Sequence, residues 1–237
     1  MRIVGWNCQG GLKKKWAALL RLEPDIAVIS EAAPKALMEL PAGAGMAMWA
    51  GDATKCVAIV PFNSWQLEPC GVEITETYFV PAIATKGDRS INLVGVWVKS
   101  ANSYVEPTLR ALSSLSAFMR TENTIVIGDF NQSVNFDKGR SAGRRFQDVL
   151  EVFRTFEMRS AWHHHRDERH GSESVPTHRF RRHSHEPFHI DYAFVPSRLN
   201  VKQIEIDDFD QGVMSGLSDH APIILDLEVP QMLKLSA

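Results

Sequence analysis

Cysteine and long apolar runs are scarce in this sequence, and each absence excludes a class of protein. The three cysteines, Cys8, Cys56 and Cys70, are an odd number without a C-x-x-C pair, which argues against a disulfide framework and a zinc cage. No apolar run approaches the ~18 residues that a membrane-spanning helix needs. Polar Asn7 and Gln9 fall where a signal peptide would have its apolar core, so we expect a cytoplasmic protein without a membrane span.

An excess of charge of one sign is also missing, because the net charge is only −2 over 237 residues. Taken alone, this balance argues against a strongly electrostatic partner such as bulk nucleic acid. The charge is nevertheless segregated, since residues 138–185 carry eleven basic and six acidic side chains together with seven of the nine histidines. The remaining residues have a net charge of −7, so an anionic partner is expected at the basic segment.

Hydrophobic periodicity predicts a chain that begins as β-α-β, with strands at 2–8 and 25–31 around a helix at 12–22. Eight further strands are predicted, the first four of them spaced as in a meander: 45–50, 55–62, 75–85, 90–98, 124–128, 188–195, 201–206 and 221–229. Helices are predicted at 104–120 and 143–158, and the polar stretch from about 163 to 177 predicts a long loop. No linker divides the chain, so we expect one domain over residues 1–237, with two packed sheets flanked by helices.

Acidic and amide side chains stand beside apolar strands at four places, where strand ends would project them rigidly into a shared cleft. These places hold Asn7, Glu31, Asp129 with Asn131, and Asp219 with His220. Asp191 differs, because it lies inside an apolar strand where an unpaired charge is costly, and we expect a histidine as its partner. Metal-assisted phosphoester hydrolysis needs three kinds of group: oxygen ligands for Mg²⁺, a histidine oriented by a carboxylate, and a second carboxylate near water.

Five strings, in this order, carry a resemblance: GWNCQG from residue 5, ISE from residue 29, GDFN from residue 128, HIDY from residue 189 and SDH from residue 218. Together they resemble the endonuclease/exonuclease/phosphatase superfamily, which includes exonuclease III-like and DNase I-like enzymes. The strings span residues 5–220, so the resemblance covers nearly the whole chain. It implies an α+β fold, a four-layer αββα sandwich of two mostly antiparallel sheets, with the active site at one rim.

The resemblance implies a metal site for Mg²⁺, with Mn²⁺ as the alternative. Glu31 would be the principal ligand, Asp219 would lie near the metal, and Asn7 would lie beside the metal and the phosphate. Exonuclease III-like members tend to have an acid two positions after the asparagine, where this chain has Gln9. We therefore expect one metal ion to suffice.

The resemblance also implies groups that handle water and phosphate. Asp129 would position or deprotonate the attacking water, and Asn131 would contact the phosphate. Asp191 would orient His220. By itself the pair at 129 and 131 is also typical of a turn cap, and the other four strings favour the functional interpretation.

The central strand departs from part of the family. DNase I-like members carry a histidine at its end, whereas residues 94–100 read VGVWVKS and contain none. Lys99, or Tyr104 at the start of the next helix, would supply the missing phosphate contact.

Residues 176–183 mix side chains that bind phosphates with side chains that stack on bases. Arg179, Arg181 and Arg182 would hold phosphates of a nucleic acid, and His178 or Phe180 would stack on a base. The alternative is a basic hairpin face that is merely solvated.

His163, His164, His165 and His170 form a second cluster of possible metal ligands. Structural zinc normally recruits a cysteine or a second, well-separated pair, so the cluster is more typical of incidental metal affinity in a solvated loop. A structural zinc site is the alternative.

The leading hypothesis is a Mg²⁺-dependent phosphodiesterase, favoured to be monomeric, that hydrolyses DNA or RNA by in-line attack of an activated water. A second hypothesis keeps the same core but changes the substrate to a small or lipid-linked phosphate ester. A binding protein without catalysis is the third, and the intact acid and histidine motifs disfavour it. Setting aside the four acids of the metal site moves the net charge from −2 to +2, so near-neutrality no longer excludes nucleic acid.

Overall fold

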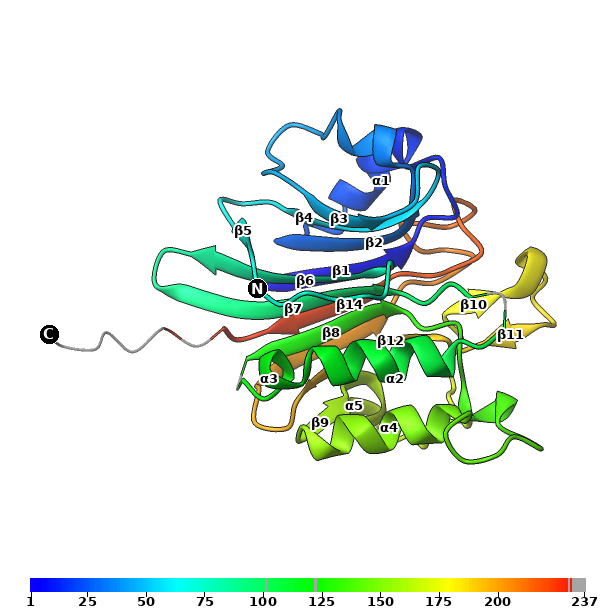
Figure 1. Ribbon diagram of the computed structural model, residues 1–237. Helices are drawn as coiled ribbons and strands as arrows, with labels where there is room; N and C mark the ends of the chain where they lie inside the picture. The colour runs from blue at the N-terminus through cyan, green and yellow to red at the C-terminus, as the bar shows by residue number, and fades with distance from the viewer. Residues whose placement is uncertain (101, 122, 230, 232–237) are drawn as a thin grey trace, which may run out of the picture.

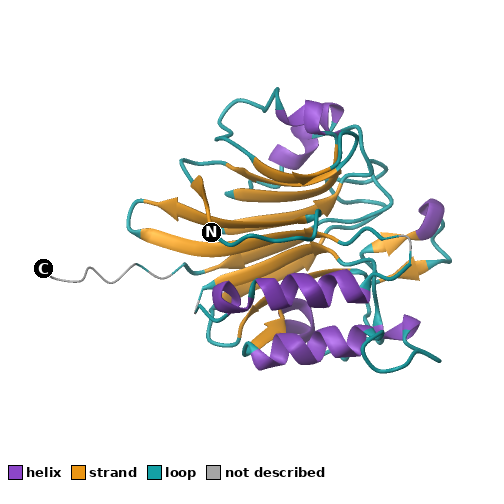
Figure 2. Ribbon diagram, in the orientation of Figure 1, coloured by secondary structure: helices purple, strands orange, loops and turns teal. Residues whose placement is uncertain are grey.

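Two six-stranded sheets pack face to face, and helices cover their outer faces (Figure 1). The computed structural model describes residues 1–100, 102–121, 123–229 and 231. Figure 2 shows α1 (Trp16–Leu20) on one side of the strands, and α2 (Val105–Ser114) and α4 (Phe146–Thr155) on the other. The predicted four-layer αββα sandwich of class α+β is therefore confirmed.

The first sheet has the strand order β13-β14-β1-β2-β4-β3. Its strands are β1 (Arg2–Asn7), β2 (Ile26–Ala32), β3 (Met48–Gly51), β4 (Cys56–Pro61), β13 (Val201–Ile206) and β14 (Ile223–Leu227). β1 runs parallel to β2 on one side and antiparallel to β14 on the other. The first strand of the chain is thus paired with a strand near its other end.

The second sheet has the strand order β5-β6-β7-β8-β12-β9. Its strands are β5 (Gln66–Pro69), β6 (Phe79–Lys86), β7 (Arg89–Trp97), β8 (Thr124–Asp129), β9 (Met158–Ser160) and β12 (Asp191–Pro196). The four runs predicted as one meander are divided, because β3 and β4 join the first sheet and β6 and β7 the second. Periodicity reports that a run is buried, not which strand it pairs with.

The apolar core occupies the space between the sheets and the two spaces beneath the helices. Between the sheets, Val28 and Ile59 of the first face Leu93 and Ile127 of the second. The sheets approach closely at β1, where a Cβ on Gly5 would lie 2.8 Å from the Ile127 side chain. The close packing holds the two sheets, and with them their edges, in one relative position.

The expected long loop from 163 to 177 is wrong at its start, because the helix α5 (Ala161–Arg166) covers its first residues. His163 is buried in this helix, whereas His164 and His165 are exposed. Because the three residues are identical, their sequence shows no alternation of apolar and polar side chains from which the helix could be predicted. The edge strands β5 and β9 were also not predicted, since three or four residues are too few to show alternation. The remaining short elements are η1 (Leu12–Lys14), η2 (Pro34–Leu37), α3 (Ser116–Met119), η3 (Val134–Phe136), β10 (His178–Arg179), η4 (Phe180–Arg182) and β11 (Pro187–Phe188).

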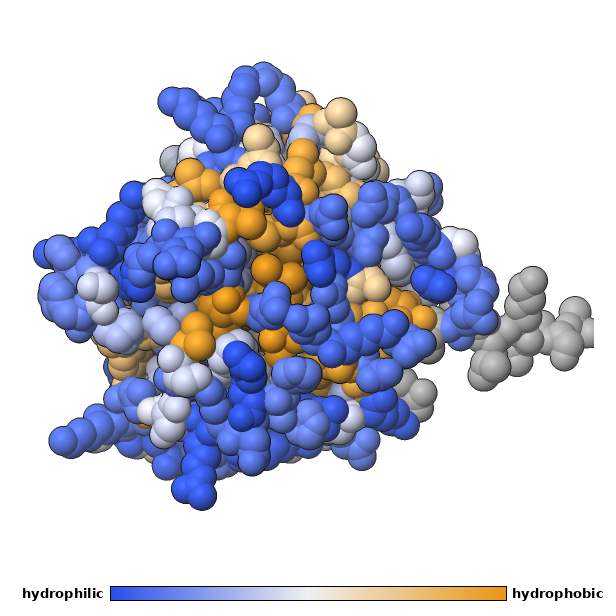
Figure 3. Space-filling model, turned by 180° about the vertical axis from the view of Figure 1, so that it is seen from behind, coloured by the Kyte–Doolittle hydropathy of each residue, from blue (hydrophilic) through white to orange (hydrophobic). Residues whose placement is uncertain are grey.

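Every helix in the described part of the chain is too short or too polar to cross a membrane. Figure 3 shows the face opposite to that of Figure 1 as largely hydrophilic, with apolar residues reaching the surface in a band across its middle. Some apolar exposure of this kind is ordinary, because no folded chain has enough polar groups to cover its whole surface.

Candidate active site

The predicted site residues lie at strand ends, on the edge of the sandwich where these strands terminate or begin. Asn7 ends β1, Asp129 ends β8, and Glu31 is the next-to-last residue of β2. β12 runs antiparallel to β8, so its first residue, Asp191, pairs with Asp129. His220 precedes β14, which runs antiparallel to β1. Since antiparallel strands begin where their neighbours end, all five residues lie at the same edge.

Two carboxylates and one imidazole form the buried centre of the site. The Nδ1–H of His220 donates to Asp191 Oδ2 at 2.8 Å, which confirms the predicted histidine partner. Asp129 joins them, with one ligand atom of each residue within 4.8 Å of the others. Burial opposes the charged imidazole, but the charges of Asp191 and Asp129 outweigh burial and raise the pKa of His220. Burial, and then the charge of Asp191, raise the pKa of Asp129. The centre therefore pairs a protonated imidazole with a carboxylate of increased basicity.

Asn7 connects this centre to Glu31. Its Nδ2 donates to Asp129 Oδ2 at 2.8 Å and to Glu31 Oε1 at 3.1 Å. Its Oδ1 accepts the backbone N–H of Gln9 at 2.9 Å. One buried amide therefore orients both carboxylates at once.

Glu31 stands on an irregular piece of strand. The pairing of β2 with β4 shifts register between Ile29 and Ala32, and Glu31 has a left-handed φ of 58°. Its carboxylate forms an ion pair with Lys55, the residue before β4. Burial would raise the pKa of Glu31, but the hydrogen bonds from Lys55 and Asn7 outweigh it and hold the pKa below its ordinary value. Lys55 was not predicted as a site residue, because a single lysine before a strand does not indicate a functional role.

Asn131 acts on Asp129. Its backbone N–H donates to Asp129 Oδ1 at 2.8 Å, and its Nδ2 donates to Asp129 Oδ2 and to the Val98 carbonyl, both at 3.1 Å. A left-handed φ of 52°, which asparagine tolerates better than most residues, turns the amide back toward the strand end. These donors orient Asp129, and the phosphate contact expected of Asn131 stays a prediction.

Two buried hydroxyls hold the backbone around the centre. Thr177 Oγ1 accepts the backbone N–H of Asp191 at 3.0 Å. Ser218 Oγ donates to the Asn7 carbonyl at 2.7 Å and accepts the backbone N–H of His220 at 3.1 Å. Ser218 belongs to one of the five strings, whereas Thr177 was not singled out, because only the fold brings it to Asp191.

Asp219 lies at the outer side of the site. Its Oδ2 accepts Nε2 of Gln9 at 2.6 Å, and Oε1 of Gln9 accepts Nη2 of Arg182 at 2.7 Å. Gln9 therefore bridges Asp219 to Arg182.

His178 enters the site from the β10–β11 hairpin. Its ring centroid lies 4.4 Å from that of His220, and its Nε2 lies 3.9 Å from Asp219 Oδ2. Burial, and then the charge of His220, lower the pKa of His178 to about 4, so the ring is neutral at pH 7. The sequence suggested this residue for base stacking, and the fold brings it beside the central imidazole.

Lys99 belongs to a polar group at the rim. Its Nζ donates to Asp52 Oδ2 at 3.1 Å and to the Tyr78 hydroxyl at 3.2 Å. The Lys99 ammonium lies 5.3 Å from a ring centroid of Trp97. The ammonium of Lys55, which pairs with Glu31, lies 5.9 Å from a ring centroid of the same tryptophan. The structure thus places Lys99 near the site, and Asp52 and Tyr78 are further rim residues that the sequence did not indicate.

The other predicted substrate-binding residues have different surroundings. Tyr104 precedes α2 and packs half-buried against the apolar layer beneath that helix. Arg179 forms a bidentate ion pair with Asp210 at 2.8 and 2.9 Å, so its charge is matched within the protein. Arg181 lies with its guanidinium 5.2 Å from the ring of the exposed Phe180. Figure 1 shows this hairpin projecting from one end of the sandwich.

The donor set at this edge fits a hard divalent cation. Carboxylate oxygens are the ligands that Mg²⁺ prefers, and Glu31 and Asp219 supply them. The ion pair of Glu31 with Lys55 shows that this carboxylate already stands opposite a positive charge. The structure brings Asp219 within 4.8 Å of ligand atoms of His178 and His220, whereas Glu31 as principal ligand and Asp219 as second ligand stay predictions.

Solved structures share this fold. No protein-family model and no curated protein matches the chain. The endonuclease domain of TRAS1, a telomere-specific non-LTR retrotransposon, is 17% identical, with a TM-score of 0.69 over 96% of this chain and 98% of its own. The AP endonuclease LMAP from Leishmania major is 15% identical, with a TM-score of 0.74 over 97% and 88%. A 3′ phosphatase from Neisseria bound to a product DNA hairpin is 18% identical, with a TM-score of 0.65 over 96% and 99%. The chain therefore has the DNase I-like sandwich fold.

Proposed function

We propose that this protein is a metal-dependent hydrolase that cleaves phosphodiester bonds of nucleic acid. The observation that carries the proposal is the buried group of Asp129, Asp191 and His220, tied by Asn7 to Glu31. Two buried carboxylates around an imidazole are costly to a fold, and such groups with shifted pKa values gather at catalytic sites.

Each side chain then has one task in in-line attack of water at phosphorus. Asp129, whose basicity burial increases, takes the proton of the attacking water. Asp191 holds Nδ1 of His220, which leaves the proton on Nε2 for transfer to a phosphate oxygen as negative charge develops there. Asn131 is a positioning residue, because its donors hold Asp129 in place.

A divalent cation held by Glu31, with Asp219 as a second ligand, would offset the charge of the phosphate and stabilise the leaving oxygen. We propose Mg²⁺, with Mn²⁺ as the alternative, since both favour oxygen ligands. We propose a monomer, as predicted from the sequence. The single domain and the cytoplasmic location stay predictions from the sequence.

Nucleic acid is the proposed substrate because the hairpin beside the site offers both charge and an aromatic ring. Arg181 and the exposed Phe180 stand at its tip, and Arg182 reaches Gln9 at the outer side of the site. Cations that follow a phosphate backbone and rings that stack on bases are the usual parts of a single-strand binding surface. Two of the similar structures are an AP endonuclease and a 3′ phosphatase bound to a product DNA hairpin.

The function is tested with a substrate panel of labelled single- and double-stranded DNA, RNA, a phosphomonoester and a lipid-linked phosphodiester. We expect cleavage of a nucleic acid that is lost in EDTA and restored by added Mg²⁺. Turnover of the phosphomonoester or lipid substrate alone would mean that the same residues act on a small or lipid-linked phosphate ester instead of nucleic acid. Cleavage that persists unchanged in EDTA would contradict the metal dependence.

Charge reversal at the hairpin is expected to weaken substrate binding without removing the chemistry. The double variant Arg181→Glu, Arg182→Glu should raise KM about tenfold and lower the slope of log KM against log salt by about 2, since two phosphate contacts are lost. Arg89→Glu is the matched control, because Arg89 begins β7 and lies at the far end of that strand from Trp97. An equal KM in the double variant and the control would mean that the hairpin is only solvated.

A further inference from the structure

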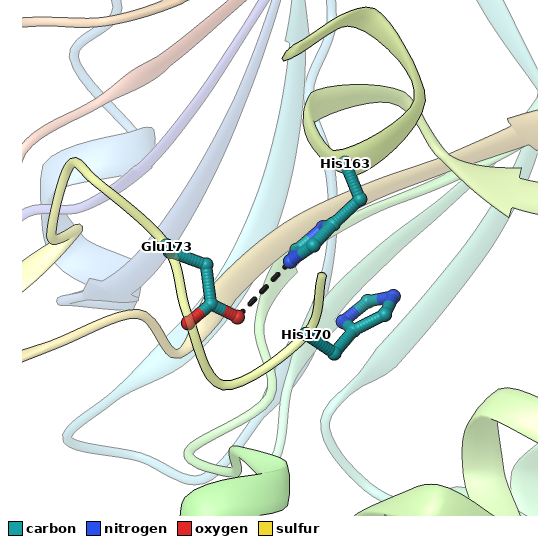
Figure 4. A group of neighbouring side chains, drawn as sticks. All are labelled: His163, His170 and Glu173. Atoms are coloured by element: carbon teal, nitrogen blue, oxygen red, sulfur yellow. Dashed lines mark hydrogen bonds and ion pairs between the residues drawn. The ribbon is translucent and has the colours of Figure 1, made fainter. Parts of the chain in front are cut away.

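A second group of metal-ligand side chains lies apart from Glu31, in the segment between α5 and β12. His163 of α5 bonds through Nε2 to Glu173 Oε1 at 3.0 Å, and the ring of His170 stacks on that of His163 at 3.5 Å between centroids. One ligand atom from each of the three residues lies within 4.8 Å of the other two. Figure 4 shows the carboxylate facing the His163 ring and the His170 ring beside it.

Two ring nitrogens in this neighbourhood are buried without a hydrogen-bond partner. One is Nδ1 of His170, which belongs to the group itself. The other is Nε2 of His189, a residue that is 5% exposed and whose ring lies 5.4 Å from that of His163 between centroids. Nδ1 of His189 donates to the Val175 carbonyl at 2.9 Å, so Nε2 carries a lone pair and no proton. Unpaired buried nitrogens are rare and costly, and a cation bound by the group would give Nδ1 of His170 a partner.

The types of ligand atom indicate which metal binds, and the burial of the ligand side chains indicates the role of that metal. Imidazole nitrogens with one carboxylate suit Zn²⁺, whereas Mg²⁺ prefers oxygen ligands alone. The side chains of His163 and Glu173 are 7% and 5% exposed, so substrate cannot reach a metal between them. A zinc ion buried in this way is structural rather than catalytic.

We propose that His163, His170 and Glu173 bind one structural Zn²⁺ ion. The ion fastens α5 to the segment that follows it. This segment contains Thr177, whose hydroxyl holds the backbone of Asp191. The zinc ion thus acts as a positioning group for the active site and takes no part in the chemistry.

The first test is the metal content of the purified full chain. The protein is equilibrated with Zn²⁺ in the presence of saturating Mg²⁺, passed through gel filtration, and its metals are counted by mass spectrometry. We expect about one zinc ion per chain, and loss of that zinc in His170→Gln and Glu173→Gln. The double variant His164→Gln, His165→Gln is the matched control, because these two histidines of the same helix are exposed, and it should keep the zinc.

A thermal melt provides a second readout that does not depend on activity. Zinc at 100 times its Kd should raise the Tm of the unchanged chain and of the control by about 5–10 °C, and should leave both ligand variants unmoved. The proposal is overturned if the unchanged chain holds no stoichiometric zinc, or if His170→Gln and Glu173→Gln retain it. Loss of the zinc in Glu31→Gln instead would assign the ion to the active site and would equally overturn the proposal.

Discussion

Replacement of His220 by asparagine is expected to lower kcat for phosphodiester hydrolysis by about 10²- to 10⁴-fold, the range for removal of a positioned proton donor. Asparagine keeps a polar group opposite Asp191 but cannot carry the proton that His220 holds between two carboxylates. Asp129→Asn should have an effect of similar size. Three N–H donors point at the Asp129 carboxylate, and an amide would turn its own NH₂ toward one of them.

The measurement is single-turnover cleavage of the best substrate of the panel, with circular dichroism to show that each variant is folded. His185→Asn is the matched control. His185 is a histidine of the β10–β11 hairpin, and its side chain is 74% exposed. If His220→Asn and the control cleave at the same rate, His220 is not the proton donor, and the site has been assigned wrongly.

Asp191→Ala is expected to lower the free energy of unfolding by about 3–5 kcal/mol, the usual cost of removing one partner from a buried ion pair. His220 is 6% exposed, and its Nδ1–H has Asp191 as its acceptor. Removing that acceptor leaves a buried imidazole N–H without a partner beside the strand end. Urea denaturation followed by fluorescence of the six tryptophans gives the free energy.

Asp226→Ala provides the comparison, because Asp226 also pairs across strands but with the partly exposed Arg2, at 2.8 Å. That pair should contribute only about 0–1 kcal/mol. The double variant Asp191→Ala, His220→Ala should recover part of the loss, since the unpaired imidazole is gone. A loss for Asp191→Ala no larger than that for Asp226→Ala would show that the buried pair carries little stability.

The strand ends were predictable because the signal is local. Asn7, Glu31 and Asp129 each follow an apolar run directly, and periodicity located those runs to within a residue or two. Asp191 was predictable for a different reason, since an acid inside an apolar strand demands a partner. Periodicity already indicated two packed sheets flanked by helices, and the order of the five strings then indicated the four-layer αββα sandwich with the site at one rim.

The residues that were missed depend on pairing between distant parts of the chain. Lys55 reaches Glu31 only because β4 lies beside β2, and Thr177 reaches Asp191 only because the hairpin folds back along residues 219–221. No local pattern marks either contact. The buried His163 was hidden similarly, since its neighbours His164 and His165 are exposed on the same helix.

The pairing of β1 with β14 also bears on how the protein is made. The N-terminal amine donates to the Leu227 carbonyl at 3.0 Å, and His220 accepts the Trp6 indole N–H through its backbone carbonyl at 3.0 Å. While the ribosome is still adding residues before 220, β1 has no β14 beside it and the cleft has no imidazole. A chain released early is therefore expected to be inert toward nucleic acid, so that hydrolytic capacity arises only as synthesis of the sandwich nears its end.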